Sequence, residues 1–110
     1  MNKIGVLGGT FDPPHGAHLE IARRSISQFG LNKVIFIPSG NPWQKKDSTS
    51  FLHRFEMTKI LINESEFLEI SDIEKSEENP SYTYETLLRL DHPKEDLYFI
   101  LGSDLSLIHI

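Results

Sequence analysis

The chain has 110 residues, of which 38% are hydrophobic and 25% charged, and this composition is typical of a single soluble globular domain. It contains no cysteine, which excludes disulfides, a thiolate zinc site and a cysteine nucleophile. No apolar run approaches the roughly 18 residues of a membrane span, so we expect a cytoplasmic protein with no membrane partner.

The net charge of −5 is unevenly distributed along the chain. Residues 1–60 hold eight Lys or Arg against four Asp or Glu, whereas residues 61–110 hold three against twelve. An acidic balance is not typical of a general nucleic-acid binder, so we expect no nucleic-acid partner. A site for an anionic ligand should lie in the first half.

Strand and helix patterns alternate along the chain. The hydrophobic patterning and the glycine and proline stops predict strands at 3–7, 33–37, 67–70 and 97–101, and helices at about 19–29, 51–63 and 84–90. Residues 71–80 are acidic and polar and predict an exposed connection. The alternation favours parallel strands joined by right-handed crossovers, which is an open α/β sheet.

Ligands of open α/β sheets bind beyond the carboxyl ends of the strands. Three segments follow predicted strands here, at 8–18, 38–46 and 102–104. We therefore expect the chemistry of the protein to be found in these segments.

The segment Gly8–Leu19, with the sequence GGTFDPPHGAHL, joins a predicted strand to a predicted helix. Backbone amides and the helix dipole favour an anion at such a junction, and two adjacent glycines allow the backbone to approach a phosphate closely. Two prolines stiffen the turn, and His15 and His18 have a spacing that can place both on one helical face. The segment has neither the dinucleotide fingerprint nor the lysine of a P-loop.

Two other interpretations of His15 and His18 compete with a phosphate site. A histidine pair at this spacing is by itself more often structural than catalytic, and it is the glycine turn that reverses this preference. Zinc would need further ligands, and with no cysteine and no third ligand nearby these residues cannot form a closed tetrahedral site. We predict no metal ligands in the chain.

The segment resembles the signature of the nucleotidylyltransferase superfamily, a His-x-Gly-His pattern after a Gly-Thr-Phe-Asp-Pro turn. Here the pattern is His15-Gly16-Ala17-His18, with Ala17 in place of the usual glycine. The longer run is most similar to the bacterial nicotinate-nucleotide adenylyltransferases. Further matches to that branch follow in order: IPSG at 37–40 with Pro42 and Lys45, His53-Arg54 with Met57, ISDIE at 70–74, PSYT at 80–83 with Thr86-Leu87, and LGSD at 101–104.

This resemblance implies a Rossmann-like nucleotidylyltransferase fold and transfer of AMP from ATP to nicotinate mononucleotide, with Mg²⁺ required. It also implies a role for each matching residue. The transition state would be stabilised by His15 and His18, and ATP would be bound by Gly8, Gly9, Thr10 and Phe11. Lys45 would contact a phosphate. The pyridine carboxylate would be held by Ser81, Tyr82 and Thr83, and the ribose hydroxyls would be met by Asp104.

Several of these residues also have a simpler interpretation. Lys45 could be an ordinary solvated lysine, and Asp104 could lie in a plain turn. Either Ser81 or Thr83 could be a helix N-cap. Two residues keep two interpretations each: Trp43 could cover a ligand ring or the core, and Arg54 could be a phosphate ligand or an ordinary surface residue. Alternative functions are a related transferase for pantetheine phosphate or glycerol phosphate, and a nucleotide-binding module without activity. The oligomeric state is left open.

The last residues of the chain differ from the family pattern. Members of the family continue past the fourth strand, so we expect residues 1–104 to be an incomplete domain that is inactive alone and exposes an apolar sheet edge. Residues 105–110, LSLIHI, match one reading frame of a transposase end sequence used for sequencing libraries. We expect them to be a loosely held non-native tail, in which His109 has no role, and with no crossover long enough for another parallel strand.

Overall fold

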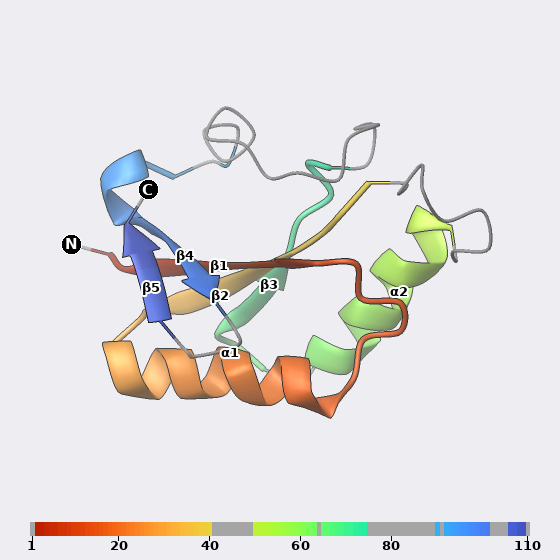
Figure 1. The fold of residues 1–110 in the computed structure, drawn as a ribbon, viewed down its shortest axis with the longest axis horizontal. Coiled ribbons are helices and arrows are strands. Elements are labelled where there is room, and N and C mark those ends of the chain that lie inside the picture. The colour runs from red at the N-terminus through yellow and green to blue at the C-terminus, as the bar shows by residue number, and fades with distance from the viewer. Residues whose placement is uncertain are drawn as a thin grey trace.

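The computed structural model describes residues 2–40, 50–63, 65–74, 90, 92–101 and 106–109. In this part of the chain a five-stranded sheet has the order β3-β2-β1-β4-β5 (Figure 1). The elements are β1 (Ile4–Gly9), α1 (Gly16–Phe29), β2 (Lys33–Pro38), α2 (Phe51–Ile62), β3 (Leu68–Ile70), the 3₁₀ turn η1 (Lys94–Asp96), β4 (Leu97–Leu101) and β5 (Ser106–His109). Strands β1 to β4 run parallel, which confirms the predicted α/β class.

Strand β2 is an apolar run because both of its faces are buried. Val34 and Phe36 belong to one hydrophobic cluster, and Ile35 and Ile37 belong to a second cluster on the opposite face. Successive side chains of a strand point to opposite faces, so a strand that is covered on both sides cannot alternate apolar and polar residues.

The two helices cover one face of the sheet (Figure 1). Leu19, Ile21 and Ile26 of α1 and Leu61 of α2 pack against the first cluster, which contains Phe36. On the other face the second cluster includes Leu90, and Ile73 packs against it. The sheet is therefore the middle layer between the helices and the segments that precede β4.

The end of α1 is held by two features. Gly30 adopts the left-handed conformation (φ 66°), and its N–H donates to the carbonyl of Ile26, as the sequence predicted for a glycine stop. Lys3, from the start of the neighbouring strand, donates from Nζ to the carbonyl of Phe29 at 2.8 Å. A cation here complements the negative end of the helix dipole.

Two expectations about the second half of the chain need correction. Glu74 is fully buried, so residues 71–74 are not simply an exposed connection; residues 75–80 and most of the predicted helix at 84–90 lie outside the described residues. Residues 106–109 form β5, antiparallel to β4, with Leu101 paired to Ser106. An antiparallel strand needs only a short connection to its partner, so the lack of a crossover excludes a parallel strand here but not an antiparallel one. The non-native origin of 105–110 is still a prediction.

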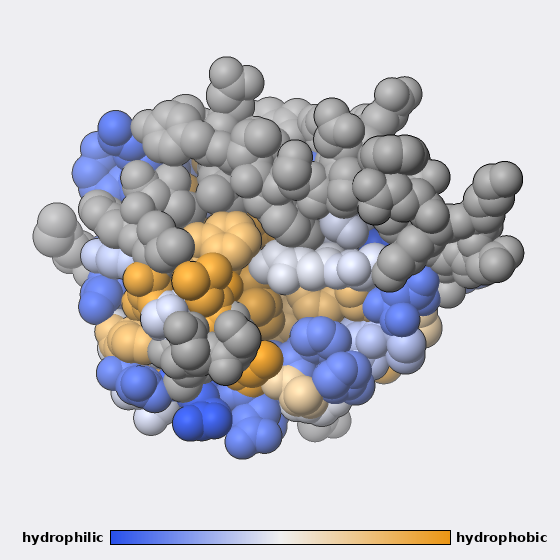
Figure 2. Space-filling model, in the orientation of Figure 1, coloured by the Kyte–Doolittle hydropathy of each residue, from blue (hydrophilic) through white to orange (hydrophobic). Residues whose placement is uncertain are grey.

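Apolar surface gathers over the β4–β5 side of the sheet (Figure 2). Leu101 of β4 is exposed and Leu107 of β5 is half-buried. Apolar edge strands are prone to pair with other chains. The sequence predicted such an edge at the fourth strand, but β5 pairs with β4, so β5 is the edge strand instead. In the described ranges, no helix is both long and apolar enough to cross a membrane.

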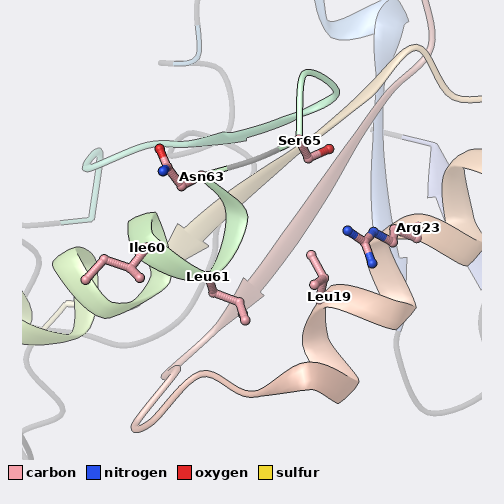
Figure 3. Close-up of a pocket in the computed structure, with 6 residues that line it drawn as sticks. All are labelled: Leu19, Arg23, Ile60, Leu61, Asn63 and Ser65. Carbon is pink, nitrogen blue, oxygen red and sulfur yellow. The ribbon is translucent and has the colours of Figure 1, made fainter.

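A cavity of about 450 Å³ lies between the two helices (Figure 3). It is lined by residues of α1, of the end of α2 and of the turn that follows: Leu19, Arg23, Ile60, Leu61, Asn63 and Ser65. None of the sequence-predicted site residues lines it.

Candidate active site

The segments expected to carry chemistry start from one edge of the sheet. Strand β1 is central, with the parallel strands β2 and β4 on either side, so the carboxyl ends of all three point the same way. Gly9 pairs with Pro38, and just beyond this pair the N–H of Ser39 donates to the carbonyl of Gly9 at 2.8 Å. This confirms the predicted proximity of the turn after β1 and the segment after β2.

The turn after β1 contains a strained residue. Phe11 has a φ of 52°, in the left-handed region that a bulky side chain rarely adopts and that costs about 1–2 kcal/mol. Its ring is only 2% exposed and lies 4.9 Å from the His18 ring, edge to face, and 5.6 Å from the Phe36 ring. Packing of the ring in the core offsets the backbone cost and anchors the turn beneath His18.

Gly9 is not required by the protein fold itself. A Cβ added to Gly9 would meet the Phe11 ring at 3.4 Å, which is ordinary van der Waals contact, and its φ is outside the left-handed region. The close approach of a ligand to this backbone, which the sequence motif predicts, stays a prediction.

The two histidines form the cap of α1. His15 is the N-cap residue, and its Nδ1 accepts a hydrogen bond from the N–H of Ala17 at 3.2 Å. In return the Nδ1 of His18 accepts from the N–H of His15 at 3.1 Å. This is the reciprocal arrangement of a capping box, made here by two imidazoles. The structural and the catalytic interpretations of the pair are therefore compatible.

This bonding assigns the tautomer of both rings. A neutral imidazole has one N–H and one acceptor nitrogen, and both Nδ1 atoms are used as acceptors. The proton of each ring is therefore at Nε2. The ring centroids of His15 and His18 lie 4.2 Å apart, so the two imidazoles are neighbours, and the His18 ring also contacts Phe11 of the glycine turn.

Partial burial lowers the pKa of His18, and repulsion from His15, whenever that ring is protonated, lowers it further. Burial disfavours the imidazolium because the charged form loses hydration. His18 is therefore neutral at physiological pH, in the state that lets Nδ1 accept the backbone N–H and Nε2–H donate.

One of the two sequence-based interpretations of Arg54 is wrong, and the other, a phosphate ligand, stays a prediction. The side chain is 0% exposed, so it is not a surface arginine, and its guanidinium is directed at backbone carbonyls of the site. Nη1 donates to Thr10 and to Ser39, both at 2.9 Å, and Nη2 donates to Gly40 at 3.3 Å. Arg54 thus links the turn after β1 to the segment after β2.

The sequence held a signal for this role. Every third or fourth residue of α2 is buried, in a stripe that comprises Phe51, Arg54, Thr58 and Ile62. An arginine and a threonine that share a buried helical stripe with Phe and Ile must meet polar partners. Thr58 does so by donating to the carbonyl of Arg54 at 2.8 Å.

The remaining predicted site residues lie outside the described residues, as does Trp43. They are Lys45, Ser81, Tyr82, Thr83 and Asp104. Among the residues that the structure does describe, no three His, Asp or Glu side chains are grouped closely enough to hold a metal ion.

Comparison with known proteins gives one consistent result. The family model described as cytidylyltransferase-like matches residues 6–107. A probable nicotinate-nucleotide adenylyltransferase of Clostridium tetani is 46% identical over 94% of this chain and 54% of its own length, and the nicotinate-nucleotide adenylyltransferase of Bacillus subtilis is 41% identical over 96% and 58%. The chain thus spans about half the length of the curated relatives it matches.

A solved structure agrees with this result. The nicotinic acid mononucleotide adenylyltransferase of Plasmodium falciparum, complexed with NaAD, superposes with a TM-score of 0.71 at 27% identity. The match covers 94% of this chain and 53% of that one. The Rossmann-like nucleotidylyltransferase fold predicted from the sequence is confirmed.

Proposed function

We propose that this chain, which belongs to the cytidylyltransferase-like family, provides the triphosphate-binding half of an active site that transfers AMP from ATP to nicotinate mononucleotide. The products would be deamido-NAD and pyrophosphate. The observation that carries the proposal is the pair of neighbouring imidazoles at the start of α1, whose Nδ1 atoms accept backbone N–H groups in the His15–His18 capping box. The names of the relatives and the NaAD complex of the Plasmodium enzyme support the choice of substrates.

The reaction needs positioning and neutralisation of charge more than a protein nucleophile. A phosphate oxygen of the mononucleotide attacks the α-phosphorus of ATP in line; a new P–O bond forms as the bond to the leaving pyrophosphate breaks. His15 and His18 would donate from Nε2 to the phosphate oxygens as negative charge shifts onto them. Because both rings are already oriented by backbone bonds, this stabilisation requires little reorganisation.

We expect Mg²⁺ to enter the site as a partner of ATP. This ion is commonly held through substrate phosphates and waters together with one or two carboxylates. The ion would neutralise charge on the leaving pyrophosphate. The chain's own residues would bind the triphosphate through the glycine-turn amides and the two imidazoles.

The substrate contacts of the other predicted residues are part of the same proposal. Lys45 would contact a phosphate, Ser81, Tyr82 and Thr83 would hold the pyridine carboxylate, and Asp104 would meet the ribose hydroxyls. We place the reaction in the cytoplasm, with neither a nucleic acid nor a membrane as partner.

Titration calorimetry tests the phosphate role directly. ATP–Mg is titrated into the chain, into His18→Ala and into His53→Ala, in which an exposed histidine of α2 is removed instead. A hydrogen bond to a charged group contributes about 1.5–3 kcal/mol, so we expect His18→Ala to bind about tenfold or more weakly. Unchanged affinity in His18→Ala would remove this histidine from the phosphate site.

A second assay tests the acceptor. Pyrophosphate release is followed with nicotinate mononucleotide, nicotinamide mononucleotide and phosphopantetheine side by side, using the protein encoded by the gene recovered from the source DNA. We expect release with nicotinate mononucleotide. Preference for phosphopantetheine would identify a related transferase, and ATP binding without release from any acceptor would identify a binding module.

A further inference from the structure

We propose that Arg54 is a positioning residue that locks the glycine turn to the end of β2 and so presets the backbone for a triphosphate. The inference rests on the proposed function and extends it to a residue that touches neither substrate nor the reacting atoms. Its basis is the set of three guanidinium-to-carbonyl hydrogen bonds, which reach two segments that are far apart in the sequence.

The carbonyls that Arg54 meets all lie beyond the ends of strands. Thr10 follows β1, and Ser39 and Gly40 follow β2, where a backbone carbonyl no longer has a sheet partner and still needs one if it is buried. The guanidinium supplies several N–H donors in a rigid planar fork, so a single side chain can serve both segments. A lysine has no such fork.

The position of Arg54 is not explained by helix stability. It lies one turn after Ser50, the N-cap of α2, at the helix end where the dipole disfavours a cation. A fully buried charge is also costly unless it is hydrogen-bonded. The hydrogen bonds of Arg54 fix the distance between the turn after β1 and the segment after β2.

The link acts on the residues that face the ligand. The carbonyl of Gly9 accepts from the N–H of Ser39, and the carbonyls of Thr10 and Ser39 both accept from Nη1 of Arg54. Gly9, Thr10 and Ser39 are therefore joined in one hydrogen-bonded set. The residue after Thr10 is Phe11, the strained residue whose ring contacts the His18 ring. Displacement of Thr10 would therefore move both the glycine turn and the support of the His18 ring.

The proposal is tested with two substitutions of Arg54 and one matched control. Arg54→Lys keeps the charge and loses the fork, Arg54→Met removes both, and Arg24→Met removes the same charge from an exposed position of α1. For each variant, ATP–Mg affinity is measured at two salt concentrations, and the ¹⁵N amide shifts of 8–12 and 39–40 are recorded without nucleotide.

We expect Arg54→Lys to bind ATP–Mg at least tenfold more weakly, with shift changes concentrated at 8–12 and 39–40. Because the charge is kept, the salt dependence of binding should match that of the native chain. We expect Arg24→Met to leave affinity and these shifts unchanged. Native affinity in Arg54→Lys would overturn the proposal, since charge alone would then suffice.

A measurement on the native chain covers the case in which the variants do not fold. Carbonyl-bonded Nη groups should give resolved proton signals that exchange slowly with solvent before any nucleotide is added, and averaged, rapidly exchanging signals would overturn the proposal. If the native chain does not bind ATP–Mg, the proposed function fails. The shift pattern and the protection of Arg54 then still decide whether the lock exists.

Discussion

His15 caps α1, and we propose that it also binds phosphate; two substitutions distinguish these two roles. In His15→Ala the hydrogen bond from the Ala17 N–H at 3.2 Å is lost, together with the ring contact to His18 at 4.2 Å. Loss of an N-cap side chain costs about 1 kcal/mol. For a chain of 110 residues this corresponds to a fall in Tm of roughly 4 °C. In His15→Asn the side-chain oxygen can accept the same N–H, so the Tm should stay close to that of the native chain.

The two variants should differ in stability but be alike in their affinity for ATP–Mg. Neither alanine nor asparagine offers the Nε2–H of His15 at the imidazole position, so both variants should bind ATP–Mg about tenfold or more weakly by calorimetry. Thermal unfolding followed by circular dichroism supplies the stabilities. If His15→Asn bound ATP–Mg like the native chain, the ring would not meet the phosphates, and if His15→Ala unfolded at the native Tm, the cap would contribute nothing.

Four further outcomes follow from the described geometry. Gly9→Ala should change the free energy of unfolding by less than about 0.5 kcal/mol in urea titrations, yet weaken ATP–Mg binding, because only a ligand needs the space; equal binding would contradict this. Gly30→Ala, at φ 66°, should lose about 1–2 kcal/mol of stability, whereas Gly16→Ala, with open space and an ordinary φ, should not. The lowered pKa of His18 means that the unfolded chain binds its proton more readily, so stability should fall as pH drops from above 6.5 through that pKa, and the fall should be shallower in His18→Gln. Because the chain spans about half the length of its curated relatives, we also expect it to release no measurable pyrophosphate by itself, and turnover would contradict this.

Local pattern was sufficient for most of the fold. The strand at 97–101 coincides with β4, and Gly30 ends α1 as a glycine with positive φ should. Boundaries were less well predicted at the site itself, where β1 continues to Gly9 and α1 begins at Gly16. The helix there is started by side-chain caps from two histidines, and histidine is not among the residues that ordinarily mark an N-terminus. Strand β5 was missed because pairing with a neighbouring strand depends on tertiary context.

The site was predictable where the motif is local and not where it depends on contacts between distant residues. The glycine turn and the histidine pair lie within eleven consecutive residues, so a sequence pattern can contain them. Arg54 is 44 residues from Thr10 and 14 from Gly40, and no spacing rule links these positions. The helical spacing of Arg54 with Phe51 and Ile62 could at most suggest a buried arginine, and it gives no indication of which carbonyls the guanidinium meets.

The capping box, the left-handed Phe11 and the buried Arg54 share one physical consequence. Each fixes part of the proposed phosphate site by interactions formed on folding: backbone bonds to the imidazoles, ring packing beneath the strained turn, and a guanidinium between two loops. The free energy needed to order these groups is therefore spent when the chain folds, and binding of ATP would not have to supply it. Substitutions that loosen any of the three should weaken nucleotide binding by more than the loss of a direct contact, because the remaining groups then have to be ordered at the moment of binding.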